Sequence, residues 1–412
     1  MPTNYDVIVI GGGASGMMAA GRAAERGKRV LLLEKNRYLG EKLKISGGGR
    51  CNVTNAQENE HLFLSHYGAS AGFLHSSFAQ FGMSDTFSFF TSRGLPLIIE
   101  AGNRAFPETQ KALDVFHTLE TYLKKGKVDV RAKTEVRSVI AKEGRIEKAI
   151  TNHGEFSATS YILSTGGKSH PETGSTGDGF AWLKQLGHTV EAPTPTIVPL
   201  AVSNQWVKAL AGITLPDVKI TFFVNGKKKL SRKGNILCAH FGLTGPTILN
   251  VADKVSDMLQ EGAVTAEIDL YPALDLGALD KYVTTIFDSN KNKTLKNVFK
   301  LIAPVGSSVA LLSLVKKIDP EKKIHDITKE ERKIIVNLLK ALPVTIKGLM
   351  GYDRAVVADG GLVIKEIDGK TMRSKICENL FVTGDLLHIK RPSGGYSLQL
   401  CWTTGYVAGS FA

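Results

Sequence analysis

Only four cysteines occur in the 412 residues, at positions 51, 238, 377 and 401, and no two of them form a Cys-x-x-Cys pair. This absence excludes a thioredoxin-like redox motif and a zinc ribbon, and it argues against a secreted protein held together by disulfides. No apolar run reaches the roughly 18–20 residues of a membrane span. The N-terminal apolar run leads directly into a glycine motif that the mature protein needs, which is not typical of a signal peptide. A cytoplasmic protein without membrane contact is therefore predicted.

Proline is scarce, with 14 residues, whereas glycine is abundant, with 42. Glycine without a fixed period indicates tight turns and close approaches of the backbone to a ligand. Apolar residues make up 43% and charged residues 22%, close to the globular average, so global disorder is excluded. The net charge of +13 favours a polyanionic partner such as nucleic acid, although a basic soluble enzyme explains it equally well.

The first forty residues predict a strand, a turn, a helix and a second strand. An apolar, β-branched run at 5–10 is typical of a buried parallel strand. Small residues at 17–26 indicate a helix that ends at Gly27. A second apolar run at 29–33 predicts the next strand, and Glu34 stands at its carboxyl end.

Gly11, Gly13 and Gly16 form a G-x-G-x-x-G turn between the first strand and the helix. Gly11 permits the sharp turn, Gly13 lets backbone N–H groups approach a pyrophosphate, and Gly16 lets the helix pack closely on the sheet. The positive end of the helix dipole then faces the phosphates. Glu34 is placed to accept hydrogen bonds from a ribose, and its charge disfavours a 2′-phosphate. The segment therefore predicts a dinucleotide site that disfavours NADP.

Three later segments favour FAD over NAD in this site. A glycine-rich loop at 39–55 follows Glu34, a strand at 161–167 ends in two glycines, and a strand at 380–385 ends in Gly384-Asp385. Each alone is compatible with ordinary turn chemistry. Their order along the chain indicates FAD, with Asp385 accepting a ribityl hydroxyl.

The segments 46–55, 173–179, 240–246, 370–375 and 394–399 resemble those of the BaiN/YhiN-type (RdsA-like) NAD(P)/FAD-dependent oxidoreductase flavoproteins, over essentially the whole chain. The resemblance implies contacts with FAD from Ser15, Glu34, Lys35, Arg50, Val136, Gly384, Asp385 and Leu398, with Val136 at the adenine edge. The glycine turns and their neighbours complete the expected cofactor site: Gly11, Gly13, Ala14, Gly16, Ser46, Gly47, Cys51, Thr165 and Gly166.

The chain departs from this family at three places. The family commonly has Tyr at the position of His170 and Gly-Glu at the position of Gly384-Asp385, and its segment matching 387–392 is usually acidic and contains glycine. Asp385 can replace Glu as an acceptor, so FAD binding is still expected. The substituted segment is expected near the isoalloxazine ring, where it affects the choice of substrate.

The predicted fold class is α/β, a split Rossmann-like FAD-binding domain of the two-part glutathione-reductase type, with residues 1–190 and 345–412. The inserted residues 191–275 predict a small β-barrel or sandwich with a hairpin at Asn225-Gly226. Residues 276–344 predict a basic helical subdomain, in which a capping box at Thr328 opens a helix that runs through Leu342.

Positive charge is concentrated in the inserted part. Residues 291–347 hold thirteen Lys/Arg and five acidic residues, and the hairpin adds Lys227, Lys228, Lys229, Arg232 and Lys233. Such runs are often a solvated face. A polyanion-binding arm is the other interpretation, and an RNA contact there would depend on phosphates and shape.

The chain has a single dinucleotide fingerprint, so electrons are expected from NAD(P)H docking transiently over the flavin or from another carrier. The predicted catalytic residues are Cys51, His240 and Tyr396, as proton donors; His170 is a further candidate, and Arg50 or Arg104 could hold an anion. Each also has a structural interpretation, in packing, in a turn or on the surface. No metal is predicted.

Four functions are compatible with these features. They are reduction of uridine to dihydrouridine in ribosomal RNA, reduction of a small enone such as a bile-acid-like steroid, oxidation of a small amine such as aminoacetone, and a non-catalytic FAD-holding, RNA-binding role. The first two and the amine oxidase are suggested by the family resemblance. The positive charge favours the rRNA uridine reductase, and the bile-acid-like reductase is the next alternative.

Overall fold

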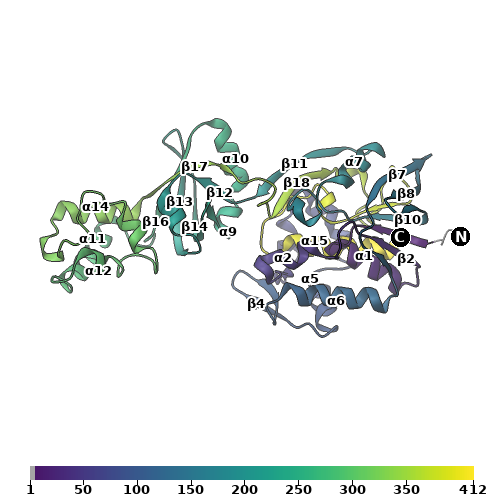
Figure 1. Ribbon diagram of the computed structural model, residues 1–412, viewed down its shortest axis with the longest axis horizontal. Coiled ribbons are helices and arrows are strands. Elements are labelled where there is room, and N and C mark those ends of the chain that lie inside the picture. The colour runs from purple at the N-terminus through teal and green to yellow at the C-terminus, as the bar shows by residue number, and fades with distance from the viewer. Residues whose placement is uncertain (1–4) are drawn as a thin grey trace. The chain divides into compact units, whose positions relative to one another are not determined.

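The computed structural model describes residues 5–412, which form two compact units (Figure 1). The first unit comprises the described residues up to Thr196 together with Tyr352–Ala412. The second unit is Ile197–Gly351. Among residues 5–412, no helix has the length and apolar character to cross a membrane.

The first unit is built on a five-stranded parallel sheet in the order β19-β10-β1-β2-β6. The strands are β1 (Tyr5–Ile10), β2 (Val30–Leu33), β6 (Asp129–Arg131), β10 (Ala158–Leu163) and β19 (Leu380–Val382). The strands β1, β2 and β19 are largely apolar and buried because both faces of a parallel sheet are covered, whereas β6, at the edge of the sheet, has exposed residues. Since β1 lies between β10 and β2, the carboxyl ends of three strands meet around the turn after β1. The predicted Rossmann-type α/β fold is confirmed.

Helix α1 (Ala14–Glu25) follows that turn, and α15 (Tyr396–Phe411) packs along it, as the neighbouring purple and yellow helices in Figure 1 show. Glycines make this contact close. A Cβ at Gly405 would lie 2.4 Å from the Ser15 carbonyl oxygen, and one at Gly409 would lie 2.3 Å from that of Ala19. The end of the chain is thereby fixed against the helix that begins at the glycine turn.

Smaller elements complete the first unit. Two three-stranded antiparallel sheets are formed by β7 (Val136–Lys142), β8 (Arg145–Thr151) and β9 (Gly154–Phe156), and by β3 (Thr54–Asn55), β5 (Arg104–Pro107) and β4 (Leu97–Glu100); β11 (Val190–Ile197) pairs with β18 (Val357–Leu362). The remaining helices are α2 (Glu41–Ile45), α3 (Glu60–Ser65), α4 (Ala71–Phe78), α5 (Met83–Thr91), α6 (Ala112–Lys125) and α7 (Asp178–Gln185).

The second unit contains a closed barrel with its own apolar core. Its strand order is β12 (Leu200–Val202), β15 (Gly242–Thr244), β14 (Lys227–Ala239), β13 (Thr214–Val224), β16 (Val264–Asp269) and β17 (Leu342–Leu349). The barrel helices are α8 (Gln205–Ala209), α9 (Pro246–Leu249) and α10 (Ala252–Glu261); a helical segment between β16 and β17 holds α11 (Leu276–Asp288), α12 (Leu295–Phe299), α13 (Ser308–Leu312) and α14 (Lys329–Lys340).

Local signals in this unit are mostly confirmed. Asn225 and Gly226 both have positive φ in the β13–β14 hairpin, and Thr328 forms a capping box with Glu331 at the start of α14. The predicted helix through Leu342 is wrong, because α14 ends at Lys340. Leu342 instead begins β17 and pairs with Ile268, and this long-range pairing overrides the helical pattern.

Candidate functional site

The glycine turn after β1 places three backbones in contact. Gly11 has φ +103°, and a Cβ there would lie 2.5 Å from the Ser164 carbonyl oxygen at the end of β10. A Cβ at Gly16 would lie 1.9 Å from the Gly11 carbonyl oxygen. A Cβ at Gly13, by contrast, would meet nothing within 4 Å. The turn is therefore tightly packed toward the sheet and open beside Gly13.

The start of α1 offers backbone donors to this open space. Gly13 is the N-cap residue and supplies no side-chain cap, and the first turn carries no acidic residue. The N–H groups at the start of a helix need an acceptor from outside the helix. A pyrophosphate suits this position in charge and in hydrogen bonding.

Glu34 is held in a fixed position at the end of β2. Its side chain accepts hydrogen bonds from the backbone N–H of Gly12 and of Asn36, both at 2.8 Å. The residue is buried. Each carboxylate oxygen keeps a second lone pair for a hydroxyl donor. This geometry fits recognition of a ribose.

The loop after β10 lies against the same turn. The Thr165 Oγ1 is buried and has no hydrogen-bond partner within residues 5–412, which is unusual for a buried hydroxyl. Gly166 follows it with φ +75°. A Cβ at Gly384, in the turn after β19, would lie 2.9 Å from the Ser15 Oγ. The structure thus brings together the predicted residues of the 11–16, 165–166 and 384–385 segments.

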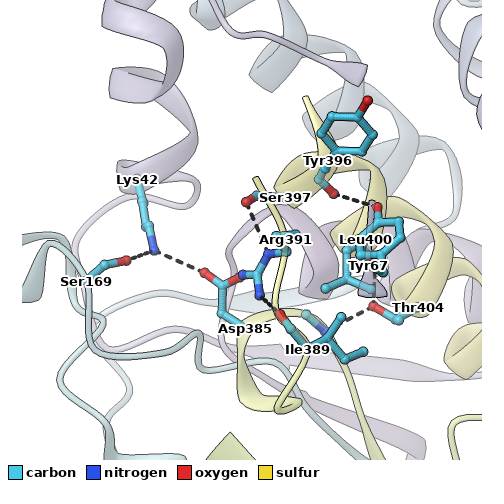
Figure 2. A network of polar contacts seen from close by, with 11 residues as sticks. Lys42, Tyr67, Ser169, Asp385, Ile389, Arg391, Tyr396, Ser397, Leu400 and Thr404 are labelled. Atoms are coloured by element: carbon cyan, nitrogen blue, oxygen red, sulfur yellow. Dashed lines mark hydrogen bonds and ion pairs between the residues drawn. The ribbon is translucent and has the colours of Figure 1, made fainter. Parts of the chain in front are cut away.

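Asp385 is the centre of an ion cluster in the turn after β19 (Figure 2). Its Oδ2 accepts from the Lys42 Nζ at 3.1 Å, and its Oδ1 accepts from the Arg391 guanidinium. The Lys42 Nζ also donates to the Ser169 Oγ. Burial alone would raise the pKa of Asp385, but the Lys42 and Arg391 charges outweigh it and hold that pKa below its ordinary value.

Other predicted cofactor residues are engaged with protein partners. Lys35 pairs with Asp178 at 2.6 Å. Arg50 pairs with Glu100 and lies 4.0 Å from the ring centroid of Phe106. Four more expected cofactor residues lie at the start of β7, in a short 3-10 turn and on α15: Val136, which is buried, Ser46, Gly47 and Leu398.

Cys51 is fully buried, and burial raises the pKa of its thiol to about 12. The thiol therefore stays protonated at neutral pH and is not a nucleophile there. Its backbone has φ +61°, and its N–H donates to the Ser46 carbonyl oxygen at 3.0 Å. These contacts give Cys51 a packing role in the 46–51 turn.

Tyr396 is the first residue of α15 and is buried. Its ring stacks on His66, with centroids 4.6 Å apart and planes at 16°. Burial raises the pKa of the Tyr396 phenol, which keeps it protonated. In Figure 2 its hydroxyl points away from the Asp385 cluster, while its carbonyl oxygen accepts from the Tyr67 hydroxyl at 2.9 Å.

His66 is a candidate that the sequence did not single out. Its Nδ1 lies 2.8 Å from the Leu62 carbonyl oxygen, to which it can only donate. The side chain is exposed. No local signal indicates the stacking on Tyr396, because the two residues lie far apart in the chain.

His240 lies in the second unit, in the turn between β14 and β15, and is exposed. His170 has φ +54° and lies with its Nδ1 2.7 Å from the Glu172 Oε1. The Arg104 Nε donates to the Ala101 carbonyl oxygen at 3.0 Å. These contacts fit turn and surface roles for His170 and Arg104.

The first unit fits FAD in four respects: the open space beside Gly13, the uncapped start of α1, the fixed carboxylate of Glu34 and the unpartnered hydroxyl of Thr165. When bound, the flavin supplies hydride transfer, and the protein supplies binding, orientation and electrostatics. Gly13 and α1 would face the pyrophosphate and Glu34 a ribose.

The chain is similar to known proteins over nearly its whole length. The HI0933-like protein Rossmann domain matches residues 5–411. A 3-dehydro-bile acid delta(4,6)-reductase of Clostridium scindens is 28% identical over 410 residues, 98% of each chain. A ribosomal RNA dihydrouridine synthase of Escherichia coli is 26% identical over 405 residues, 98% of this chain and 96% of that protein.

Among solved structures, the 3-ketosteroid-delta4-(5alpha)-dehydrogenase of Rhodococcus jostii RHA1 superposes with a TM-score of 0.56 at 15% identity, covering 100% of this chain and 97% of that one. At this identity the likeness shows a shared fold. The match over nearly the whole described chain is the decisive one: the chain belongs to the HI0933-like Rossmann family of FAD-dependent oxidoreductases.

Proposed function

We propose that this enzyme reduces a carbon–carbon double bond conjugated to a carbonyl group, and that its substrate is uridine in ribosomal RNA. Two relatives that match almost end to end are named for a delta(4,6)-reductase and for a dihydrouridine synthase. Both names describe addition of hydrogen across a C=C bond. Cys51, His240 and Tyr396 remain the predicted sources of the proton, and NAD(P)H the proposed hydride donor.

The choice of RNA depends on one observation, the unpaired positive charge of the second unit. Of the thirteen basic residues in 291–347, five form ion pairs with acidic side chains: Lys291, Lys296, Lys322, Arg332 and Lys340. No ion pair within residues 5–412 involves the other eight, and all eight are exposed: Lys293, Lys300, Lys316, Lys317, Lys323, Lys329, Lys333 and Lys347. Unpaired surface lysines are suited to RNA phosphates.

Nucleoside mass spectrometry of ribosomal RNA, with and without the gene, tests this proposal. We expect one dihydrouridine to disappear on deletion and to return with the wild-type gene. Gly13→Asp, designed to exclude FAD, should not restore it. Lys316→Ala/Lys317→Ala, designed to weaken RNA binding, should restore it only in part. An unchanged dihydrouridine content on deletion contradicts the RNA assignment.

A steroid-type enone is the second candidate substrate, favoured by the 28% identity to the bile-acid reductase. Purified, FAD-loaded enzyme would be reduced anaerobically and mixed with a conjugated steroid dienone. Loss of the dienone absorbance, with one equivalent of flavin reoxidised, supports this substrate. Reoxidation only on admission of oxygen, with release of peroxide, indicates an oxidase instead.

A further inference from the structure

Two charged residues of the segment after β19, Asp385 and Arg391, lie in contact with each other. The Arg391 guanidinium donates to the Asp385 carboxylate (Figure 2). Asp385 is thereby paired with two cations, Lys42 and Arg391.

Arg391 is held on three sides. Besides Asp385, its Nε donates to the Ser397 Oγ at 3.1 Å and one terminal nitrogen donates to the Ile389 carbonyl oxygen at 2.5 Å. Its side chain is 1% exposed. A buried guanidinium with all three nitrogens engaged is a fixed charge, and it has little freedom to take hold of a substrate.

The cluster carries more positive than negative charge. Lys42 and Arg391 share the carboxylate of Asp385, so these three side chains carry one net positive charge; Asp359 and Lys390, of opposite charge, also lie within electrostatic range. The surroundings exclude most water, since Asp385 is 14% and Lys42 28% exposed. Electrostatic effects of such a charge extend further than those of a surface charge.

This charge lies beside the glycine turn that we assign to FAD. The Gly384 N–H donates to the Thr404 Oγ1 of α15 at 3.0 Å, and Gly384 lies against Ser15 of α1. Ser397, which holds the guanidinium, is in the first turn of α15. The cluster therefore connects the carboxyl end of β19 with the start of α15, beside the turn that faces the cofactor.

We propose that Arg391 is a positioning residue that fixes Asp385 and leaves a net positive charge beside the bound flavin, so that the flavin is easier to reduce. A hydride donor adds two electrons and one proton to the flavin ring, which gains one negative charge. The net charge of the Lys42–Asp385–Arg391 cluster stabilises that negative charge. The inference rests on the proposed function only through FAD and needs no particular substrate.

The experiment is a charge series in FAD-loaded protein. Arg391→Met lowers the cluster charge to zero, Asp385→Asn raises it to two, and Asp385→Asn/Arg391→Met restores it to one. Asp359 and Lys390 lie near Arg391 but are the same in every variant. The two-electron midpoint potential is measured against reference dyes, and FAD affinity is measured separately by fluorescence.

We expect the equilibrium constant for two-electron reduction to fall at least tenfold in Arg391→Met, about 30 mV in potential. It should rise in Asp385→Asn and stay near the wild-type value in the double variant and in Arg391→Lys. If Arg391→Met fails to load FAD, the comparison of Asp385→Asn with the wild type, which also differ by one charge, still decides. If the midpoint potential does not change with the charge of the cluster, the inference is wrong, whether or not the enzyme reduces RNA.

Discussion

Gly13→Asp should separate the stability of the fold from its capacity to bind FAD. Gly13 has φ −79° and ψ −170°, a conformation open to any residue, and a Cβ there meets nothing within 4 Å. Aspartate is among the preferred N-cap residues, and its charge is favourable at a helix N-terminus. The same carboxylate would project into the space that we assign to a pyrophosphate.

The two effects have opposite signs. Capping and the helix dipole together should raise the free energy of unfolding of the apoprotein by roughly 0.5–1 kcal/mol. Repulsion between the carboxylate and one phosphate charge at about 4 Å costs about 4 kcal/mol at an effective dielectric constant near 20. FAD affinity should therefore fall by roughly a thousandfold.

Urea unfolding of the apoprotein gives the free energy of unfolding, and fluorescence titration with FAD gives the affinity for FAD. Gly13→Asn is the matched control, because it caps without a charge and should lose much less affinity. If Gly13→Asp binds FAD as tightly as the wild type, the assignment of this turn to the pyrophosphate is wrong. If the apoprotein unfolds more easily, the open space beside Gly13 is misjudged.

Three further predictions concern other parts of the chain. In a filter-binding assay, Lys316→Ala/Lys317→Ala should weaken RNA binding about tenfold and reduce the slope of log K against log salt by about 2. The control Lys111→Ala/Lys142→Ala removes two exposed lysines of the first unit and should have little effect. Equal losses of affinity in the two variants would contradict an RNA-binding arm. Gly409→Ala should cost about 1–3 kcal/mol in urea unfolding because its Cβ would meet the Ala19 carbonyl oxygen at 2.3 Å, while Gly72→Ala, in open helical space, should be neutral or stabilising. Burial lowers the pKa of His188 despite its contact with Glu366. The contribution of the neutral imidazole to folding stability is therefore present above about pH 6.5 and is lost as the pH falls through the folded-state pKa. Tm should drop less on acidification in His188→Gln than in the wild type, and an identical pH profile of Tm would refute the lowered pKa.

His188 also shows why local geometry needs its surroundings. Its Nδ1 lies 3.1 Å from the Glu366 Oε2 and its Nε2 lies 3.0 Å from the Ser374 Oγ, an arrangement similar to a hydrolytic triad. The Ser374 Oγ, however, accepts from the backbone N–H of Ile376 and Cys377 and is buried. The hydroxyl fixes a turn and is closed to a substrate.

Sequence was sufficient where the structure depends on neighbouring residues. The strand, glycine turn and helix at 5–25, the hairpin at Asn225-Gly226 and the capping box at Thr328 each follow from local rules of backbone geometry. The family resemblance also predicted that Gly384 belongs to the same cofactor site as Ser15, although the two residues are far apart in the chain.

Sequence was insufficient where distant side chains meet. Leu342 continues a helical pattern, yet its pairing with Ile268 places it in the barrel. The stacking of His66 on Tyr396 and the contact of Arg391 with Asp385 depend on how loops are folded over the sheet. A spacing rule cannot supply such contacts, because no fixed period relates the residues involved.

Single-turnover reduction of RNA tests the central claim most directly. FAD-loaded enzyme would be reduced anaerobically, freed of excess reductant and mixed with ribosomal RNA from the deletion strain. The account predicts reoxidation of the flavin with formation of one dihydrouridine for each flavin consumed. A flavin that stays reduced, with no dihydrouridine formed, would contradict it.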